Sequence, residues 1–528
     1  MKKLKVWLPL LFAVVMILGM LIGYRLYENT NTRGFLKTRK LNRVQEVLDL
    51  VNLKYVDSVN MDSLGEEAID GILSHLDPHS YFIPASDREE MNEDLRGNFE
   101  GIGIEFLILN DTVNVINVLA KGPSDQAGLR VGDKFIKVND SIVAGNGINA
   151  DRIKKLLRGP GASTVKIAFL RGQKDTTLVI QRGAIPLPAV DAAYMIDKSV
   201  GYIRINKFSR TTYQEFMESM ESLQKQGLQK LILDLRGNGG GIVDQAVDIA
   251  DEFLDDEKLI VYTMGTRSPR KDYRAQKPGV FESGKLILLV DEGTASASEI
   301  LTGALQDWDR ATIMGRRTFG KGLVQEPFQL SDGSELRLTI ARYYTPIGRS
   351  IQKPYNKGHD EYNEEVINRF HDGEVIHGDT STNHAGPSYK TNGGRTVYGG
   401  GGITPDIFVA LDTNAISKNI TALYIGGTLN NFIYSYYMQN MDELKQFKSP
   451  AEFASGFHNE EKLWRNLVAF AAKDSIQIGQ VSAKDKETMQ TRIKALLARL
   501  IWRNDGYFQV SNLKDHVVQR AIEEIDKP

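Results

Sequence analysis

The chain has 528 residues, enough for several domains, and its 41% hydrophobic and 25% charged residues are ordinary for a globular protein. Its formal net charge is −2, so it lacks the strongly basic surface expected of a nucleic-acid-binding protein. It contains no cysteine, which excludes disulfides, thiolate metal sites and a cysteine nucleophile.

The N-terminus predicts a membrane anchor over residues 1–30. Lys2, Lys3 and Lys5 precede the uncharged and almost wholly apolar stretch Trp7–Tyr24. A stretch of about 18 apolar residues just suffices to span a bilayer, and cytoplasmic lysines would leave the rest of the chain outside the cytoplasm. No clear Ala-x-Ala cleavage site is present, which favours an uncleaved anchor, although a cleaved signal peptide would leave the body in the same compartment.

A helical region is expected at residues 31–95. Apolar residues recur at helical spacing between Leu41 and Leu53, and the helical pattern ends later at a proline. His75 and His79 lie beside that proline, but no third metal ligand is near them in the sequence. We therefore expect a structural or surface role for both histidines.

Two glycine-containing segments, Phe99–Phe106 and Gly122–Asp133, give residues 96–184 the pattern of a PDZ domain, which this region resembles. The resemblance implies that a peptide adds as a strand at the sheet edge, with the helix Ala150–Leu157 as the other groove wall. The terminal carboxylate and the last side chain would be held at four consecutive residues: Gly101, Ile102, Gly103 and Ile104. The alternative is that these glycines only make turns.

Strand and helix patterns alternate from residue 199 onward, which predicts an α/β layered body over residues 185–412. The buried strand Leu231–Leu235 leads into the glycine loop Gly237–Gly241. Unobstructed backbone N–H groups of such a loop could face a developing oxyanion. The glycines could also simply make a tight turn that needs positive φ, and the two interpretations are compatible.

A second buried strand, Lys285–Val290, is followed by a sharp turn of small residues and then by an amphipathic helix. Ser296 lies at this strand-to-helix turn, where it is a candidate nucleophile. Together with Glu299 it also fits a capping box, so it could simply cap the helix. Lys321 lies in a glycine-rich loop and is a candidate base, although most loop lysines are merely solvated.

The segment Gly315–Lys321 also imitates a phosphate-binding loop. That motif needs Ser or Thr after the lysine, where this chain has Gly322, and it should open a helix, whereas Leu323–Phe328 has a strand pattern. Gln325 lies four positions beyond Lys321, and an even spacing on an extended strand would place both side chains on one face. A nucleotide-binding protein thus stays a rival that an ATP-binding assay would test.

Gly293–Glu299, followed by Thr318–Gln325, resembles the core of the C-terminal processing peptidases, also called tail-specific proteases. In that family the middle serine of the first segment is the nucleophile, the lysine is the general base and the glutamine positions the lysine. The resemblance assigns these roles to three residues: Ser296, Lys321 and Gln325. It is also carried by Leu233–Gly241, Tyr344–Ile351 and Gly401–Asp406, and covers roughly residues 40–412.

The resemblance implies a multidomain α/β protein with a membrane anchor, a helical segment, a PDZ domain, a ββα (crotonase/ClpP-like) protease body and a helical C-terminal extension. It implies a serine endopeptidase with a Ser–Lys dyad that cleaves proteins near C-termini bound by the PDZ domain. We expect protein or peptide substrates with free C-termini, self-association, and no metal or organic cofactor. The body would lie on the periplasmic side of a bacterial inner membrane. Ala297, with Gly240 or Gly241, is the expected oxyanion hole.

Residues 354–400 are polar and rich in Gly, Asn and His, and are expected to be a long loop or insertion. Irregular spacing argues against a metal site at its four histidines: His359, His371, His377 and His384. Asp332-Gly333 predicts a hairpin turn. Residues 413–528 are expected to form helices, beginning in one case at Ser449-Pro450, which pack on the body or mediate self-association.

Two further alternatives are open. A PDZ scaffold on an inactive protease-like body would not need the candidate nucleophile and base, so their presence argues against it. A Ser-His-Asp enzyme is disfavoured because Ser296 lacks the Gly-x-Ser-x-Gly elbow and no histidine lies between residues 80 and 358, although folding could bring one close.

Overall fold

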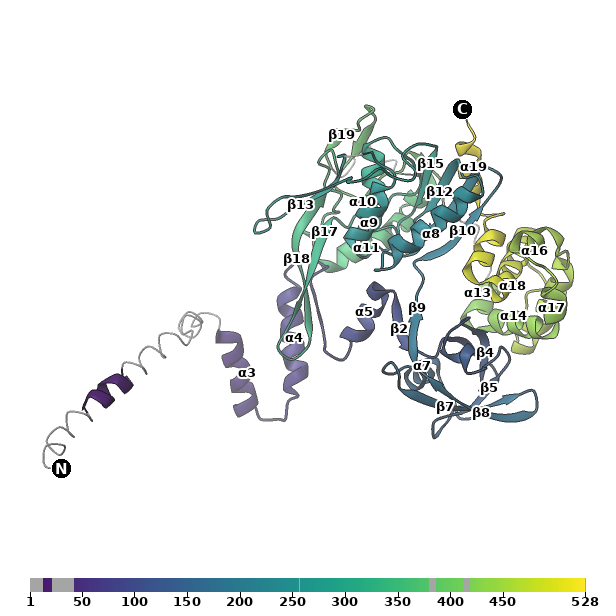
Figure 1. The fold of residues 1–528 in the computed structure, drawn as a ribbon, viewed down its shortest axis with the longest axis horizontal. Helices are drawn as coiled ribbons and strands as arrows, with labels where there is room; N and C mark the ends of the chain where they lie inside the picture. The colour runs from purple at the N-terminus through teal and green to yellow at the C-terminus, as the bar shows by residue number, and fades with distance from the viewer. Residues whose placement is uncertain (1–12, 21–41, 256, 379–385, 413–417, 528) are drawn as a thin grey trace, which may run out of the picture. The chain divides into compact units, whose positions relative to one another are not determined.

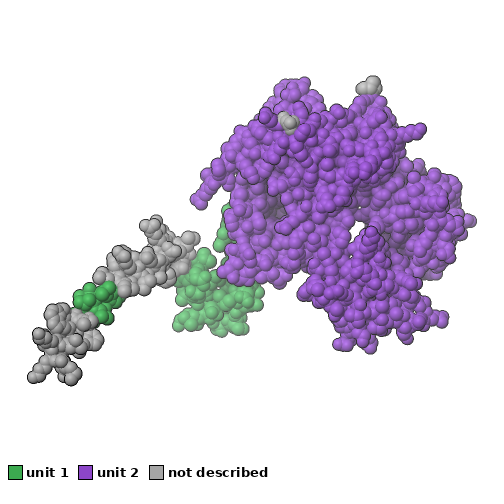
Figure 2. Space-filling view, viewed as in Figure 1, with its two compact units in different colours: residues 1–76 green, residues 77–528 purple. Residues whose placement is uncertain are grey.

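A computed structural model describes residues 13–20, 42–255, 257–378, 386–412 and 418–527 (Figure 1). The chain divides into two units, residues 1–76 and 77–528 (Figure 2). Most of the predicted anchor, with all of residues 1–12, lies outside the described residues. Among the residues that are described, no helix is both long and apolar enough to cross a membrane.

The described helices of the first unit include residues 13–20, α3 (Asn42–Lys54) and α4 (Met61–Leu73). The side chain of Asn60 caps α4 by accepting hydrogen bonds from the N–H groups of Asp62 and Ser63. The predicted helical region continues into the second unit as α5 (Arg88–Arg96). It is interrupted there by the short strand β1 (Tyr81–Ile83), which pairs with a strand more than 200 residues away and therefore leaves no local signal.

Residues 101–181 form a small sheet in the order β3-β4-β5-β7-β8, with β6 paired to β5. Ile102, Phe135 and Ile153 are buried in its own core. The strands are β3 (Ile104–Ile108), β4 (Val113–Val118), β5 (Lys134–Val138), β6 (Ser141–Ile142), β7 (Thr164–Arg171) and β8 (Lys174–Gln181). The helices are α6 (Pro123–Gln126) and α7 (Ala150–Leu157). The chain enters and leaves this domain through one antiparallel ribbon, β2 (Asn98–Gly101) with β9 (Gly183–Pro186).

The α/β body is built on a six-stranded sheet in the order β10-β11-β12-β15-β16-β21, in which only β10 is antiparallel to its neighbour. Successive residues of its strands point to opposite faces. Both faces are buried, which explains why these strands are mostly apolar, with charged residues such as Arg204 and Asp234 near their ends. The strands are β10 (Val190–Met195), β11 (Val200–Ile205), β12 (Lys230–Asp234), β15 (Leu286–Val290), β16 (Thr312–Gly315) and β21 (Ile407–Phe408).

Different helices cover the two faces of this sheet (Figure 1). Ile203, Leu233 and Leu288 pack with residues of α8 (Thr212–Lys225), α9 (Val243–Asp251) and α10 (Ala297–Asp307). On the other face Tyr202, Ile232 and Leu289 pack with the last helix, α19 (His516–Ile525). Part of the predicted C-terminal extension is therefore a layer of the body, the first of the two arrangements left open by the sequence.

A second sheet is organised around the long strand β18, which pairs along its length with β17 and, on its other side, with β1 and β13. The predicted turn at Asp332-Gly333 joins β17 to β18, with Leu330 N–H donating to Ser334 O at 2.9 Å. The strands are β13 (Leu259–Met264), β14 (Lys271–Arg274), β17 (Leu323–Gln329) and β18 (Glu335–Tyr344).

The polar insertion is more ordered than its composition suggests. Its described residues include the 13-residue helix α11 (His359–His371), the short α12 (Glu374–His377) and a hairpin of β19 (Ser388–Lys390) and β20 (Thr396–Tyr398). The expectation of one long loop was wrong because α11 is held by buried polar contacts, through Tyr362 and Arg369, instead of an apolar stripe. His384 lies outside the described residues.

The remaining C-terminal helices form their own apolar core, which includes Phe432, Phe453 and Leu497. The capping signal at Ser449 is confirmed, since its hydroxyl accepts the N–H of Glu452 at 3.1 Å. Helix α18 is interrupted by non-helical backbone at Trp502 and Arg503. The helices are α13 (Lys418–Ile425), α14 (Thr428–Gln439), α15 (Met441–Leu444), α16 (Pro450–Gly456), α17 (Glu460–Ala471) and α18 (Ala483–Ser511).

Candidate active site

One cavity of about 830 Å³ brings the three predicted catalytic side chains together. Ser296 reaches it from the β15–α10 turn, Lys321 from the loop before β17, and Gln325 from β17 itself. The glycine loop after β12 contributes a further part of the wall with Gly239, Gly240 and Gly241. Tyr81 and Arg337, which are 256 positions apart in the chain, also line this cavity.

Ser296 adopts a backbone conformation that is unusual for a residue with a side chain, with φ 55° and ψ −116°. Such conformations store strain and persist only where the surrounding structure fixes them. The turn is packed tightly against the glycine loop, because a Cβ at Gly240 would lie 2.7 Å from Cβ of Ser296 and 2.9 Å from N of Ala297. Glycine is required at position 240 for this close approach.

The capping-box pair is present in both directions. Oε2 of Glu299 accepts the N–H of Ser296 at 2.9 Å, and the Ser296 side chain lies toward the backbone N–H of Glu299. Capping therefore fixes the backbone of Ser296, while its side chain lines the cavity. The structural interpretation and the chemical one are compatible at this residue.

Glu299 is fully buried and joins the serine turn to the lysine loop. Besides Ser296 N–H, its carboxylate accepts Thr318 Oγ1 at 2.5 Å and the N–H groups of Gly320 and Lys321 at 2.8 and 2.9 Å. Burial raises the pKa of Glu299 to about 7, although these donors favour the charged form. The capping-box pattern was the only sequence signal for this residue, and it did not reveal the contacts across the site.

The Lys321 loop is supported from behind by α11. The guanidinium of Arg369, itself 3% exposed, donates to the carbonyls of Arg317, Thr318 and Phe319 at 2.8–3.2 Å. Burial lowers the pKa of the Lys321 amine below its usual value, and the charges of Glu299 and Asp77 only oppose that shift. Burial in the site thus shifts the Lys321 amine toward its neutral form.

Gln325 lies in the cavity for a different reason from the one expected. The register of β17 shifts between Val324 and Gln325, and Lys321 precedes the strand, so simple alternation along an extended strand does not relate the two. Nε2 of Gln325 instead donates to Oγ1 of Thr339, on the neighbouring strand β18, over a long 3.4 Å. The sequence had placed Gln325 beside Lys321 by an argument that does not hold.

Asp77 determines which group donates in the hydrogen bond between Gln325 and Thr339. Oγ1 of Thr339 donates to Oδ1 of Asp77 at 2.8 Å, since an ionised carboxylate can only accept. The Thr339 oxygen must then accept from the Gln325 amide, which turns the carbonyl end of Gln325 away from Thr339. Neither Asp77 nor Thr339 carries a sequence signal, because three distant segments have to meet before the relation exists.

His79 lies close to Lys321 but in a packed setting. Its Nε2 is 2.7 Å from the hydroxyl of Tyr362, and its ring contacts Phe319 and Tyr362 edge-on. Burial, followed by the charge of Lys321, lowers the pKa of His79 to about 4. A neutral, packed ring agrees with the structural role expected from the sequence.

The glycine loop distinguishes between the two expected oxyanion donors. The N–H of Gly240 donates to Oδ1 of Asn238 at 2.9 Å, so it is already engaged. The bridge to Phe208 uses O of Gly240 and N of Ile242, which leaves the N–H of Gly241 without a partner among the described residues. The N–H of Ala297 likewise has no hydrogen-bond partner among the described residues.

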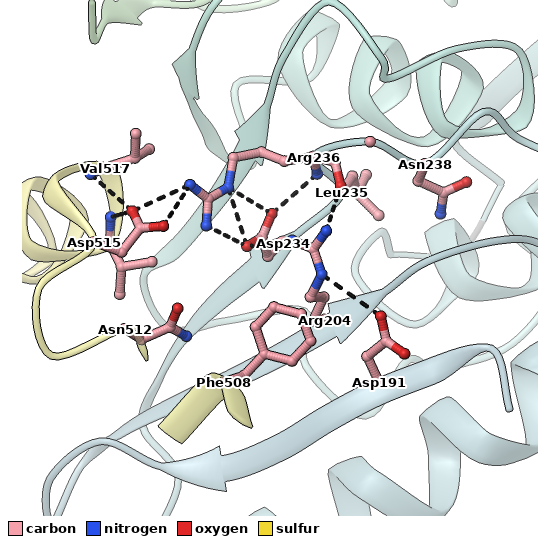
Figure 3. Close-up of polar contacts among 12 residues, drawn as sticks. Asp191, Arg204, Asp234, Leu235, Arg236, Asn238, Phe508, Asn512, Asp515 and Val517 are labelled. Carbon is pink, nitrogen blue, oxygen red and sulfur yellow. Dashed lines mark hydrogen bonds and ion pairs between the residues drawn. The ribbon is translucent and has the colours of Figure 1, made fainter. Parts of the chain in front are cut away.

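An ion cluster lies at the start of the glycine loop (Figure 3). The fully buried Asp234 accepts Nε and Nη2 of Arg236, and Nη1 of Arg204 lies 2.9 Å from its Oδ2. Burial opposes the charge of Asp234, but the two guanidinium groups outweigh it and hold its pKa well below the usual range. This stretch carries part of the family resemblance, but only its glycines pointed to a role in the site.

The four PDZ-like residues lie where β2 leads into β3. β3 is an edge strand, paired only with β4 among the described strands. Gly103 has φ 74°, and the buried Ile102 belongs to the small domain's core, against which Ile104 also packs. Gly101 instead ends β2, where it pairs with Gly183, so only Gly103 of the two glycines makes a turn.

Comparison with known proteins agrees with this arrangement. Residues 199–359 match peptidase family S41, residues 101–181 match the PDZ domain, and residues 420–504 match a family of unknown function (DUF8443). A probable CtpA-like serine protease of Staphylococcus aureus (strain MRSA252) is 35% identical over 332 residues, which are 62% of this chain and 66% of that protein. This chain thus spans just under two thirds of that relative.

A protein with the same description from Staphylococcus haemolyticus (strain JCSC1435) is 32% identical over 358 residues, which are 66% of this chain and 71% of that protein. Among solved structures, a photosystem II D1 C-terminal processing protease is 27% identical and covers 70% of this chain and 87% of its own, with a TM-score of 0.35. The sequence matches define a class of protein that combines a peptidase-family region with a PDZ domain. Within that class, the chain belongs to peptidase family S41.

Proposed function

We propose that this protein is a Ser–Lys endopeptidase that cleaves protein substrates near their C-termini. The observation that carries the proposal is the cavity in which a strained Ser296 lies with a buried Lys321 of lowered pKa. A serine needs a neighbouring base to become a nucleophile, and a lysine can act as that base only when it is neutral.

In this mechanism Nζ of Lys321 accepts the proton from Oγ of Ser296 as Oγ attacks the scissile carbonyl carbon. The lysinium then protonates the leaving amine, and an acyl-enzyme forms on Ser296. In the second half, Lys321 takes a proton from water, which attacks the ester carbonyl and releases Ser296. A free lysine has a pKa of about 10.4, so burial supplies the condition that the reaction requires.

The N–H groups of Gly241 and Ala297 are the proposed oxyanion hole. Both are without a hydrogen-bond partner in the described part of the chain, and Gly240 packs directly against Ser296 and Ala297. Fixed donors of this kind act where negative charge develops in the transition state and typically contribute about 10²- to 10³-fold each. Gly240 serves the close approach and is not a donor itself.

Gln325 is the proposed orienting residue for Lys321. The chain from Asp77 through Thr339 to Nε2 of Gln325 directs the amide carbonyl of Gln325 away from Thr339. A carbonyl oxygen free on the cavity side can accept an N–H of the Lys321 amine and leave the nitrogen lone pair for the proton of Ser296.

The PDZ domain is proposed to select the substrate. The N-terminal segment is proposed to determine the compartment in which the protein lies. The free edge of β3 and the loop Gly101–Gly103 support binding of a peptide C-terminus by strand addition. The apolar stretch Trp7–Tyr24, preceded by lysines, supports anchoring of the protein in a membrane with the body on its outer, periplasmic side. A scaffold without catalysis is not favoured, because it would have no use for a strained serine beside a buried lysine.

The proposal is tested by Ser296→Ala. We expect loss of peptide hydrolysis by at least about 10³-fold with the fold retained, because only binding and the oxyanion hole would be left. The change should cost only about 1 kcal/mol of stability, which is the usual cost of losing a serine N-cap. The measurement is hydrolysis of a peptide with a free C-terminus, with thermal unfolding as the control. Near-normal turnover by the folded variant would contradict the assignment of the nucleophile.

A further inference from the structure

The last helix of the chain is tied to the body by both packing and charge. Val517, Val518 and Ala521 of α19 are at most 2% exposed and share a core with strands of the central sheet. Just before this helix, Asp515 lies against Arg236, the residue that follows β12 and Leu235 and opens the glycine loop (Figure 3). Packing alone would not require a charged residue at that position.

Asp515 has two roles that can be separated chemically. Its Oδ1 accepts the N–H groups of Val517 and Val518 at 3.0 Å, which is ordinary capping of α19. Both of its carboxylate oxygens also accept Nη1 of Arg236, at 3.1 and 3.0 Å. The first role needs only an oxygen acceptor, whereas the second needs the negative charge.

Arg236 is held from two sides. Its Nε and Nη2 donate to Asp234 at the end of β12, and its Nη1 donates to Asp515. Its backbone carbonyl accepts Nη2 of Arg204 at 2.8 Å, and the guanidinium of Arg204 is stacked 4.8 Å from the ring centroid of Phe508. Residues from the C-terminal segment therefore contact both arginines of the cluster.

The backbone beyond Arg236 leads directly to the reacting groups. The N–H of Gly237 donates to Asp291 at 2.8 Å, and the carbonyl of Asn238 accepts the N–H of Ala295 and the hydroxyl of Ser298. Gly241, whose N–H is a proposed oxyanion donor, follows three positions later. The loop has no apolar side chain from Arg236 to Gly241, so its position depends on these polar contacts.

We propose that Asp515, at the start of the C-terminal helix, is a positioning residue that fixes the oxyanion loop through Arg236. The effect of Asp515 on catalysis rests on the proposed function, whereas its effect on the position of the loop does not. Without the charge of Asp515, the cluster of Arg204 and Arg236 would keep only Asp234 and the more distant Asp191 as carboxylate partners. The Arg236 side chain would then change its position, and the glycine loop that follows Arg236 would move with it.

The test is Asp515→Asn, supported by Asp515→Ser. Asparagine and serine are both good helix N-caps, so α19 should stay in place while the ion pair is lost. We expect kcat to fall about tenfold with KM within about twofold, because an oxyanion donor acts on the transition state and not on the bound substrate. If Asp515 had a purely structural role, less of the protein would fold, but kcat per folded molecule would be unchanged.

Asp526→Asn is the matched control. Asp526 follows the same helix and pairs with Lys230, at the opposite end of β12, over 2.7 Å. This variant removes the same charge and the same kind of contact with the same strand, but at the end distant from the loop. We expect its kcat and KM to match those of the unmodified protein.

The second readout does not depend on catalysis. Amide hydrogen exchange of a peptide covering residues 235–241 should become at least about threefold faster in Asp515→Asn and Asp515→Ser, and not in Asp526→Asn. If the unmodified protein fails to cleave peptides, the proposed function falls while the exchange data still decide the role of Asp515. Unchanged exchange in both Asp515 variants, or faster exchange with unchanged kcat in an active enzyme, would overturn the proposal.

Discussion

At the scale of single residues, Glu299 holds the two halves of the site together. One carboxylate accepts the backbone N–H of the proposed nucleophile, Ser296, and that of the proposed base, Lys321. Because this carboxylate is buried and hydrogen-bonded, its contacts fix a geometry instead of adding much net stability. Glu299 therefore fixes the backbones of Ser296 and Lys321 relative to each other.

The pH dependence of activity reports on Lys321. The base must be neutral, so kcat/KM should rise with pH through the pKa of Lys321, with a midpoint below the ordinary value of 10.5. Lys321→Arg should be nearly inactive throughout, because a guanidinium stays protonated and cannot accept the proton of Ser296. The measurement is a pH–rate profile for one peptide, and substantial activity of Lys321→Arg would exclude the Ser–Lys mechanism.

Thr339→Val tests the two hydrogen bonds that link Gln325 through Thr339 to Asp77. The valine preserves shape but neither donates to Asp77 nor accepts from Gln325, so the Gln325 amide loses its fixed orientation. We expect kcat to fall about tenfold, as in Gln325→Ala, with a double variant no worse than either single one. Thr339→Ser, which keeps the hydroxyl, is the control and should stay close to the unmodified protein. Additive losses in the double variant would separate Thr339 from Gln325.

Residue patterns revealed the reacting groups but not the groups that orient them. Ser296 and Lys321 stand out because the small-residue turn and the glycine loop have recognisable local sequences. Asp77 and Thr339 do not, since a lone aspartate and a strand threonine acquire meaning only when Thr339 donates to Asp77 across 262 positions of the chain. Gln325 was identified by resemblance, while the strand alternation offered for it is broken by the bulge in β17.

At the scale of elements, α11 is the support beneath the catalytic loop. The sequence did not predict it, because its sparse apolar positions give a weak helical stripe and its polar residues are typical of loops. The helix is nevertheless fixed by buried ion pairs: Lys353 lies 3.0 Å from Glu365, which also pairs with Arg369. Polar anchoring of this kind is determined by partners elsewhere in the chain.

Arg369→Gln should therefore lower both stability and kcat. Loss of a charged donor to three carbonyls is expected to cost about 1.5–3 kcal/mol and to loosen the backbone before Lys321. Arg310→Gln is the matched control, since Arg310 also donates to backbone carbonyls, of Phe253, Phe281 and Gly284. Thermal unfolding should fall in both variants, but kcat of the folded enzyme only in Arg369→Gln. Equal kcat in the two would show that α11 is not a support for the base.

At the scale of the whole molecule, the body is completed by distant parts of the chain. The sequence correctly indicated a PDZ domain within an α/β body, since each is carried by its own ordered motifs. It could not indicate that α19 forms a layer of the central sheet, because an amphipathic helix shows that it has an apolar face and not what that face covers. The division between body and C-terminal extension at residue 413 therefore does not follow the packing.

Substrate choice is also a property of the whole molecule, since binding and cleavage are assigned to different domains. A peptide with a free apolar C-terminus should be cleaved at least about tenfold faster, in kcat/KM, than its C-terminally amidated form. Amidation removes the charge that the loop Gly101–Gly103 is proposed to hold. The comparison uses one peptide sequence in acid and amide form. Equal rates would mean that the domain does not recognise termini.

The β2–β9 ribbon has a further consequence. Asn98 is paired with Pro186, so the chain leaves and re-enters the rest of the molecule at neighbouring points about 5 Å apart. The small domain is thus inserted between the two strands of this ribbon. If it were removed, a two-residue turn could join β2 to β9. The domain could therefore be exchanged for one with another ligand preference without changing the register of the strands around the candidate active site.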